Sequence, residues 1–168
     1  MGVRNYLVEG VSCTGKTSVA TELERRGHQV VHGDRELAYQ GDPVTGAPLP
    51  GVRHEHHVWD VGRVRELVAD RSAPVTFFCG GSRNHPRFVD LFDEVFVLDV
   101  DRQTLLDRLD HRPADEWGAR PDERELVLRV HRTGEDVPAG TPIDATRPLG
   151  EVVDEIERRA VRAGLAGP

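Results

Sequence analysis

Short apolar runs alternate with longer amphipathic stretches along the whole chain. The short runs are rich in β-branched and aromatic residues, which predicts strands, whereas apolar residues three or four positions apart in the longer stretches predict helices. We expect strands at Asn5–Glu9, Gln29–His32, Val75–Cys79, Glu94–Leu98 and Thr141–Asp144. We expect helices at Lys16–Arg26, Val58–Asp70, Arg87–Leu91, Arg102–Arg112, Pro121–Arg132 and Pro148–Ala163.

This alternation of strand and helix indicates an α/β fold with a parallel sheet. Turn residues support the assignment, since Gly27 follows the first helix as a C-cap does. Pro148 begins the last helix, at a position that needs no N–H. No repeat, low-complexity tract or linker interrupts the pattern. At 168 residues the chain is long enough to bury a sizeable core, and we expect residues 1–168 to form a single domain.

Two segments follow neither the strand nor the helix period. Gly41–His57 is rich in Gly, Pro and His, and Pro113–Arg120 lies between two predicted helices. Irregular segments of this length inside a compact domain are usually functional or mobile. In the second segment, helix breakers and the lack of a continuous apolar face predict a mobile lid at about residues 113–120.

A phosphate-binding motif follows the first predicted strand and opens the first predicted helix. Gly10-Val-Ser-Cys-Thr-Gly15-Lys16-Thr17 matches G-x-x-x-x-G-K-[ST]. In such a loop, backbone N–H groups and the helix N-terminus hold phosphate oxygens, the lysine reaches the β- and γ-phosphates, and the hydroxyl coordinates Mg²⁺. The motif predicts an ATP and Mg²⁺ site. Its expected contacts are Gly10, Ser12, Cys13, Thr14, Gly15, Lys16, Thr17 and Ser18.

Composition strengthens this prediction and excludes other classes. Lys16 is the only lysine among 22 basic residues, which fits a position where a compact ammonium is needed and arginine cannot replace it. A net charge of -7 argues against nucleic-acid binding, and no apolar stretch is long enough to cross a membrane. Without a signal peptide, and with only Cys13 and Cys79 as cysteines, we expect a cytoplasmic protein. The lack of an Asn-Lys-x-Asp motif argues against a GTPase.

Further motifs follow the P-loop in a fixed order. They are Asp34-Arg35 after the second strand, Gly80-Gly81-Ser82-Arg83 after the third, the run Val97-Leu98-Asp99-Val100-Asp101, the helix from Leu105 to Arg112, and Ile143-Asp-Ala-Thr-Arg-Pro148. Together with the P-loop they resemble the nucleoside/nucleotide-kinase group, which includes thymidylate-, adenylate- and shikimate-kinase-like enzymes. The resemblance covers nearly the whole chain. It implies a three-layer P-loop NTPase fold, with a five-stranded parallel sheet ordered 2-3-1-4-5, flanking helices and a mobile lid.

The same resemblance implies an acceptor site. Asp34 falls at the carboxyl end of the second strand, where it would orient an acceptor hydroxyl or accept its proton. An Asp there would equally suit a helix N-cap. Arg83 resembles a substrate clamp, although a solvated loop arginine would give the same pattern. Arg35 and Trp59 are the other expected acceptor contacts, with the alternative that the segment around Trp59 merely covers the pocket.

Arginines near the predicted lid form a second implied set. Arg108, Arg112 and Arg120 would stabilise charge on the transferred phosphoryl group, as lid arginines do in the resembling kinases. Surface ion pairs with nearby aspartates are the alternative for each of them. Arg147 and Pro148 fall in the loop that packs on adenine in this group, and a plain turn before the last helix is the alternative.

One departure from the pattern concerns the metal. Many P-loop enzymes place an acidic Mg²⁺ ligand at the end of the third strand, but here Val75–Cys79 runs into Gly-Gly-Ser. Metal binding would then depend on Thr17 and Asp34, so that Asp34 would serve as both base and ligand. The cluster His54-Glu-His-His57 lacks the H-E-x-x-H spacing of a zinc helix, and we expect it at the acceptor pocket instead.

These features predict an enzyme that transfers the γ-phosphoryl group of Mg·ATP to a nucleoside or nucleotide. One alternative is a kinase of another hydroxylated metabolite or antibiotic, of the shikimate- or gluconate-kinase type. Another is a nucleotide-binding regulatory protein without catalysis. We expect a small-molecule phosphoacceptor as partner, no nucleic acid or membrane, and either a monomer or a homodimer.

Overall fold

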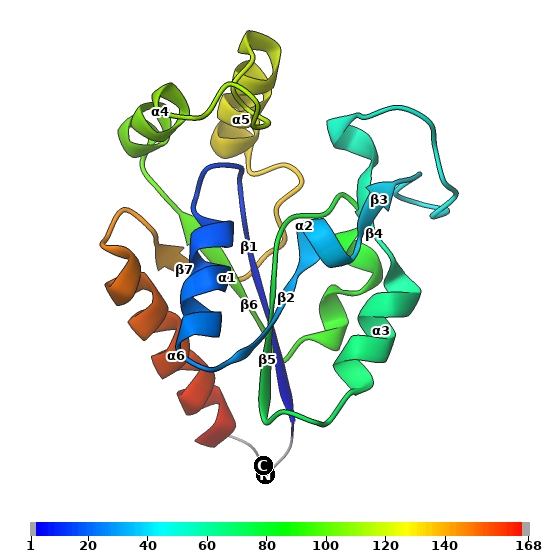
Figure 1. Ribbon diagram of the computed structural model, residues 1–168, viewed down its shortest axis with the longest axis vertical. Coiled ribbons are helices and arrows are strands. Elements are labelled where there is room, and N and C mark those ends of the chain that lie inside the picture. Colours follow the sequence, from blue (N-terminus) through cyan, green and yellow to red (C-terminus); the bar gives the residue numbers. More distant parts are fainter. Residues whose placement is uncertain (1–2, 166–168) are drawn as a thin grey trace.

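The computed structural model describes residues 3–165 and places five parallel strands in one sheet (Figure 1). They are β1 (Arg4–Gly10), β2 (Gln29–His32), β5 (Val75–Cys79), β6 (Glu94–Asp99) and β7 (Thr141–Asp144). Their order is β2-β5-β1-β6-β7. Counted along the chain without β3 and β4, which form a separate sheet, this is 2-3-1-4-5. The strand predictions and the predicted order are confirmed.

Helices cover both faces of this sheet (Figure 1). On one face, α1 (Lys16–Arg25) and α6 (Leu149–Leu165) pack against Tyr6 and Val8 of β1. On the other, α3 (Val61–Ala69) packs over Leu7, whose side chain is 1% exposed. The period of two along β1 therefore buries one half of the core on each side, which gives the expected three layers. Among the described residues, none of the helices combines the length and the apolar character needed to span a bilayer.

Two helices, α4 (Arg102–Asp110) and α5 (Pro121–Thr133), lie beyond the end of the sheet that carries the P-loop (Figure 1). The Asp101 side chain caps α4 by accepting a hydrogen bond from Thr104 N at 2.8 Å. Pro121 begins α5 without needing a donor, and Gly134 ends it in the left-handed region at φ 69°. The segment between them, 113–120, is neither helix nor strand, as predicted.

The structure corrects the predictions between residues 33 and 61. A short helix, α2 (Gly33–Glu36), precedes β3 (Ala38–Gln40), which pairs with β4 (His57–Trp59) in an antiparallel ladder. The helix expected from Val58 consequently begins at Val61, because Val58 and Trp59 belong to β4. Asp60 caps it by accepting a hydrogen bond from Arg63 N at 3.0 Å.

A second correction concerns residues 85–91. The expected helix Arg87–Leu91 is two 3₁₀ turns, His85–Arg87 and Val89–Leu91.

Candidate active site

The P-loop joins β1 to α1 through a tight turn. Gly10 has a φ of 149°, and a Cβ there would lie 2.7 Å from the Leu98 carbonyl oxygen of β6. Cys13 and Gly15 also have positive φ angles, of 69° and 107°. Such a path turns consecutive N–H groups toward one concave side, and α1 begins immediately afterwards. The loop therefore has the geometry of an anion cradle at a helix N-terminus.

Lys16 is the first residue of α1 and its side chain folds back over the loop. Its Nζ donates hydrogen bonds to the carbonyl oxygens of Gly10 and Val11, the latter at 3.0 Å. Burial lowers the pKa of Lys16, and the charges of Glu9 and Asp34 oppose that shift. The ammonium is thus held against the loop by groups that a phosphate can replace or supplement.

Two cavities open on this loop. The first, which we call the P-loop cavity, has a volume of about 690 Å³. It is lined by most of the residues that the sequence predicts as nucleotide contacts: Ser12, Cys13, Thr14, Gly15, Lys16, Thr17, Ser18 and Arg147. Pro148 is not among its lining residues, although Arg147 and Leu149 on either side of it are.

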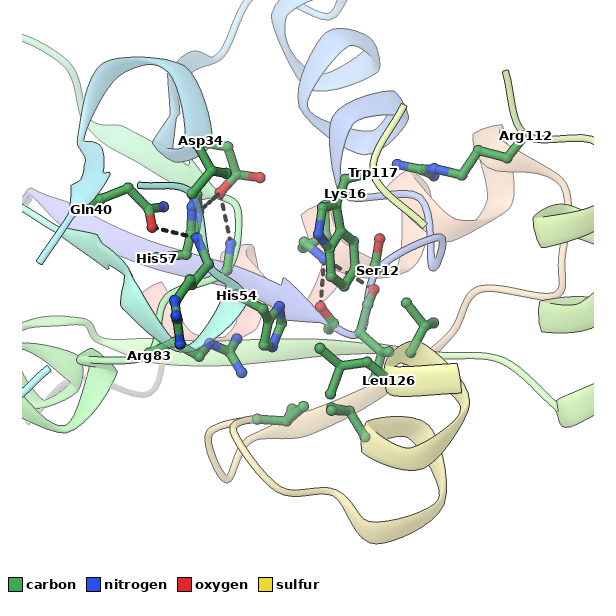
Figure 2. Close-up of a pocket in the computed structure, with 18 residues that line it drawn as sticks. Ser12, Lys16, Asp34, Gln40, His54, His57, Arg83, Arg112, Trp117 and Leu126 are labelled. Atoms are coloured by element: carbon green, nitrogen blue, oxygen red, sulfur yellow. Dashed lines mark hydrogen bonds and ion pairs between the residues drawn. The ribbon is translucent and has the colours of Figure 1, made fainter. Parts of the chain in front are cut away.

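The second cavity, which we call the acceptor cavity, has a volume of about 330 Å³, within the range of small-molecule sites (Figure 2). It lies between the P-loop, the His54–His57 segment and α5, and Gly10 lines it. Ser12, Lys16, Asp34 and Arg112 line both cavities. These four residues mark the junction at which a group could pass from one cavity to the other.

Asp34 lies at this junction, and only one of its carboxylate oxygens, Oδ1, has hydrogen-bond partners among the described residues. His57 Nε2 is 3.1 Å from its Oδ1, and Gly81 N donates to the same oxygen at 3.2 Å. Both contacts end on Oδ1, which leaves Oδ2 available to a ligand. Burial alone raises the pKa of Asp34, but the hydrogen bond from His57 and the charge of Lys16 outweigh it, so the net pKa lies below the ordinary value. Asp34 is therefore a carboxylate at neutral pH.

Glu9 is a buried carboxyl group at the site that sequence reasoning missed. It is 1% exposed, and its two oxygens accept hydrogen bonds from Gly10 N at 3.0 Å and Ser82 N at 3.3 Å. Burial raises the pKa of Glu9 to about 7, despite the opposing charges of Lys16 and Arg83. Glu9 joins the P-loop to the Gly80–Ser82 turn. An acidic residue at the end of a buried strand, directly before the P-loop glycine, was the signal that could have revealed it.

The predicted arginines reach the site to different degrees. Arg83 lines the acceptor cavity, where its Nη1 is 2.9 Å from Asp136 Oδ2. Arg108 donates to the carbonyl oxygens of Thr14 at 3.0 Å and Ala145 at 2.6 Å, so it ties the P-loop to the loop after β7. Arg112 reaches the junction, with Nη1 2.8 Å from Cys13 Sγ. Arg35 lines the P-loop cavity rather than the acceptor cavity expected for it.

Two predicted site residues lie elsewhere in the structure. Arg120 lines neither cavity, because its guanidinium, with a side chain 70% exposed, pairs with Glu123 at the start of α5. Trp59 belongs to the core instead of the acceptor pocket. It is 1% exposed, stacks on Phe88 with ring centroids 5.5 Å apart, and fills the space where Gly33 lacks a side chain.

An aromatic pair closes one side of the acceptor cavity. The rings of His54 and Trp117 stack with centroids 5.1 Å apart and an angle of 19° between their planes. Burial, followed by the charge of Arg83, lowers the pKa of His54 to about 4, so its ring is neutral at neutral pH. The pair connects the segment before β4 with the predicted lid, a contact between residues 63 positions apart that no local pattern could indicate.

Sequence and structure comparisons identify the family and the fold of the chain. A family model described as an AAA domain (AAA_18) matches residues 7–128. The chain belongs to the AAA_18 family. This AAA_18 protein has no significant match among curated proteins.

Solved structures similar to this AAA_18 protein share its fold over almost the whole chain. A sugar kinase from Janibacter sp. HTCC2649 is 18% identical, with a TM-score of 0.58 and 93% of each chain covered. Shikimate kinase from Aquifex aeolicus vf5 is also 18% identical, with a TM-score of 0.57, covering 97% of this chain and 99% of the other. A gluconokinase from Sinorhizobium meliloti 1021 is 20% identical, with a TM-score of 0.59 and 98% of each covered. The fold is that of P-loop small-molecule kinases.

Proposed function

We propose that this AAA_18 protein is an ATP-dependent kinase that transfers a phosphoryl group to a small molecule, with a nucleoside or nucleotide as acceptor. The observation that carries the proposal is the junction of the two cavities. Lys16 and Arg112 place positive charge there, and Asp34 places a carboxylate there. A phosphoryl donor in one cavity and an acceptor in the other would meet at these side chains.

The P-loop cavity suits Mg·ATP. Its backbone cradle and the N-terminus of α1 would provide donors for phosphate oxygens, and Lys16 would provide a positive charge. Thr17 lines the same cavity and would supply a hydroxyl to Mg²⁺, which usually takes few protein ligands and completes its shell with phosphate and water. Asp34 also lines this cavity, but its free Oδ2 is assigned here to the acceptor. Bound Mg²⁺ would neutralise charge that develops on the phosphates.

Asp34 has the position and charge state for a base. Its Oδ2 would accept the proton of the acceptor hydroxyl while the hydroxyl oxygen forms a bond to the γ-phosphorus. The bond from that phosphorus to the β–γ bridging oxygen breaks, and ADP leaves with the electron pair. Lys16 and Arg112 would stabilise the charge on the transferred group. Because a carboxylate repels an acceptor phosphate, this arrangement favours a nucleoside over a nucleotide.

A second candidate acceptor class is another hydroxylated metabolite. The similar structures include enzymes named for a sugar, shikimate and gluconate, all of which carry the hydroxyl that Asp34 requires. The third candidate, a regulatory protein that binds nucleotide without an acceptor, would need no second cavity at the P-loop. The acceptor cavity therefore favours an enzyme over that candidate.

ADP release in the presence of single acceptors tests the proposal. Nucleosides, nucleotides, sugars, sugar acids and aminoglycosides would each be supplied with Mg·ATP, and the phosphorylated product would be identified by mass spectrometry. We expect at least one acceptor to raise ADP release well above the slow hydrolysis seen without acceptor, with formation of its phosphate ester. Nucleotide binding together with a uniform basal rate across the panel would favour the regulatory protein instead.

A further inference from the structure

The arginines that line the acceptor cavity are already paired with acidic side chains, and the fourth lining cation, Lys16, contacts the P-loop and is assigned to the nucleotide phosphates. Three arginines line it, and each has an acidic side chain close by: Arg83 with Asp136 at 2.9 Å, Arg112 with Glu116 at 3.3 Å, and Arg53 with Glu55 at 3.5 Å. The Arg83 pair is the innermost, since the Arg83 side chain is only 10% exposed. A carboxylate on the acceptor would compete with Asp136 for this guanidinium in a partly desolvated site.

Asp34 and His54, which also line the cavity, provide no positive charge for an acidic acceptor. Asp34 presents a carboxylate at the junction, and the His54 ring is neutral at neutral pH. Arg83 still has hydrogen-bonding capacity, because its buried Nε has no hydrogen-bond partner among the described residues. A guanidinium whose charge is matched but whose N–H groups are unsatisfied suits a neutral acceptor group such as a carbonyl oxygen.

The opposite wall of the cavity is apolar. It consists of Leu126, Val127 and Val130 of α5 together with Val137, and Figure 2 shows Leu126 facing the cavity from this side. The stacked His54–Trp117 pair adds a flat aromatic surface. Hydroxyl groups of a sugar or sugar acid would lose water against the valines without finding hydrogen-bond partners. A ring without such groups would gain buried area and stacking there.

We propose that the acceptor is an electrically neutral alcohol with a flat, largely apolar ring, and that the Arg83–Asp136 pair excludes carboxylate-bearing acceptors. The hydroxyl lies at Asp34, a neutral oxygen meets Arg83, and the ring lies against Trp117 and the α5 wall. This inference rests on the proposed kinase function and narrows its acceptor. Of the acceptor classes considered, a neutral aromatic alcohol fits, as does a nucleoside whose ribose lies at Asp34 and whose base lies against Trp117, and a sugar acid or a nucleotide does not.

A matched pair of probes tests the charge rule directly. 3-Phenyl-1,2-propanediol and 3-phenyllactate share a ring and a hydroxyl and differ in one group, a hydroxymethyl against a carboxylate. Binding of each to the protein with Mg²⁺ and a non-hydrolysable ATP analogue would be measured by saturation-transfer NMR titration. We expect the diol to bind about tenfold or more tightly than the acid, as one unfavourable charged contact would produce. Equal or tighter binding of the acid, or no binding of either probe, would overturn the inference.

Two variants separate this selectivity from general damage. Asp136→Asn frees the Arg83 charge, and Asn tolerates the φ of 64° at this position. It should raise acid affinity about tenfold and leave diol affinity within about twofold. Asp90→Asn removes the same charge from an exposed 3₁₀ turn that lines neither cavity and should change neither affinity. An unchanged preference in Asp136→Asn would show that the pair does not set selectivity.

The ring contact needs its own variant. Trp117→Leu keeps apolar bulk but removes the flat surface, and should weaken diol binding about fivefold, the scale of an aromatic pair. Unchanged diol affinity in this variant would show that Trp117 does not contact the ring of the acceptor. Failure of this inference is distinguishable from failure of the kinase function. Diol binding without ADP release would support the proposed ligand class and contradict the kinase function. ADP release with gluconate or shikimate, but with no neutral aromatic alcohol, would support the kinase function and contradict the proposed ligand class.

Discussion

At the scale of single residues, we expect the sole lysine to have a role that arginine cannot take over. Lys16 Nζ lies between two P-loop carbonyl oxygens in a half-buried position, where a planar guanidinium would not fit the same contacts. We predict that Lys16→Arg, like Lys16→Ala, weakens binding of a Mg·ATP analogue about 10²-fold, the loss of roughly two charge-assisted hydrogen bonds. Calorimetric titration would measure it. Wild-type affinity in Lys16→Arg would show that phosphate binding does not depend on the ammonium group.

Glu9 should give the stability of the protein a specific pH dependence. Its pKa is about 7 when folded and near 4.5 when unfolded, so the folded state holds this proton more tightly. Below pH 4.5 both states are protonated and the effect is nil. Between pH 4.5 and 7 it destabilises the fold increasingly, by up to about 3 kcal/mol, and above pH 7 it is constant.

Glu9→Gln removes this titration. The Tm of the variant relative to wild type should therefore rise as pH increases through that window, in calorimetric melts between pH 4.5 and 8. Glu125→Gln, on the exposed side of α5, is the matched control and should show no such trend. A Tm difference for Glu9→Gln that stays flat with pH would mean that Glu9 is ionised throughout or not coupled to folding.

At the scale of elements, the longer strands could be predicted from the sequence and the three-residue strands could not. The strands of the main sheet are four to seven residues long, and β1, β5 and β6 contain apolar runs whose positions could be read from the sequence. β3 and β4 have three residues each and pair across the intervening loop, with Ala38 opposite Trp59. Three residues are too few to show a period. The sequence pattern consequently predicts Val58 and Trp59 as part of the following helix.

The site divides in the same way. The P-loop is a contiguous motif, so the residues that line the P-loop cavity from this loop could be predicted from their place in the motif. His57 on Asp34, Asp136 on Arg83 and Trp117 on His54 join segments that are 23, 53 and 63 positions apart. Such pairs depend on how the sheet brings loops together, and one sequence carries no local sign of them.

The segment 113–120 should respond to ligands as a lid. It is stabilised by single turns, such as Ala119 N to Glu116 O at 3.2 Å, and by Gly118 N donating to Glu123 at 2.7 Å. We predict that hydrogen exchange across 113–120 slows modestly with an ATP analogue and further with analogue plus acceptor, because closure excludes water. Trp117 fluorescence should change in the same order, against the constant signal of buried Trp59. Exchange and fluorescence that ignore both ligands would mean that the segment is a fixed loop.

At the scale of the whole molecule, the parallel sheet delivers both halves of the site to one edge. The P-loop follows β1, Asp34 follows β2 and the Gly80–Ser82 turn follows β5, and these three strands are neighbours in the sheet. Ligands in open α/β sheets bind at this edge because the loops there diverge and leave a crevice. Two cavities meeting at Asp34 and Lys16 are therefore a consequence of the topology.

The central claim is that Asp34 acts on the acceptor and not on ATP binding. The most direct test compares two quantities in Asp34→Asn: the Kd of a Mg·ATP analogue, by calorimetry, and kcat for the best acceptor, by ADP release. Asn keeps the shape and the contact with Gly81 N but cannot take a proton. We predict a Kd within about threefold of wild type and a kcat lower by about 10²-fold or more, the usual scale for a lost general base. A kcat that stays at the wild-type value would contradict the account and leave Asp34 a structural residue at the start of α2.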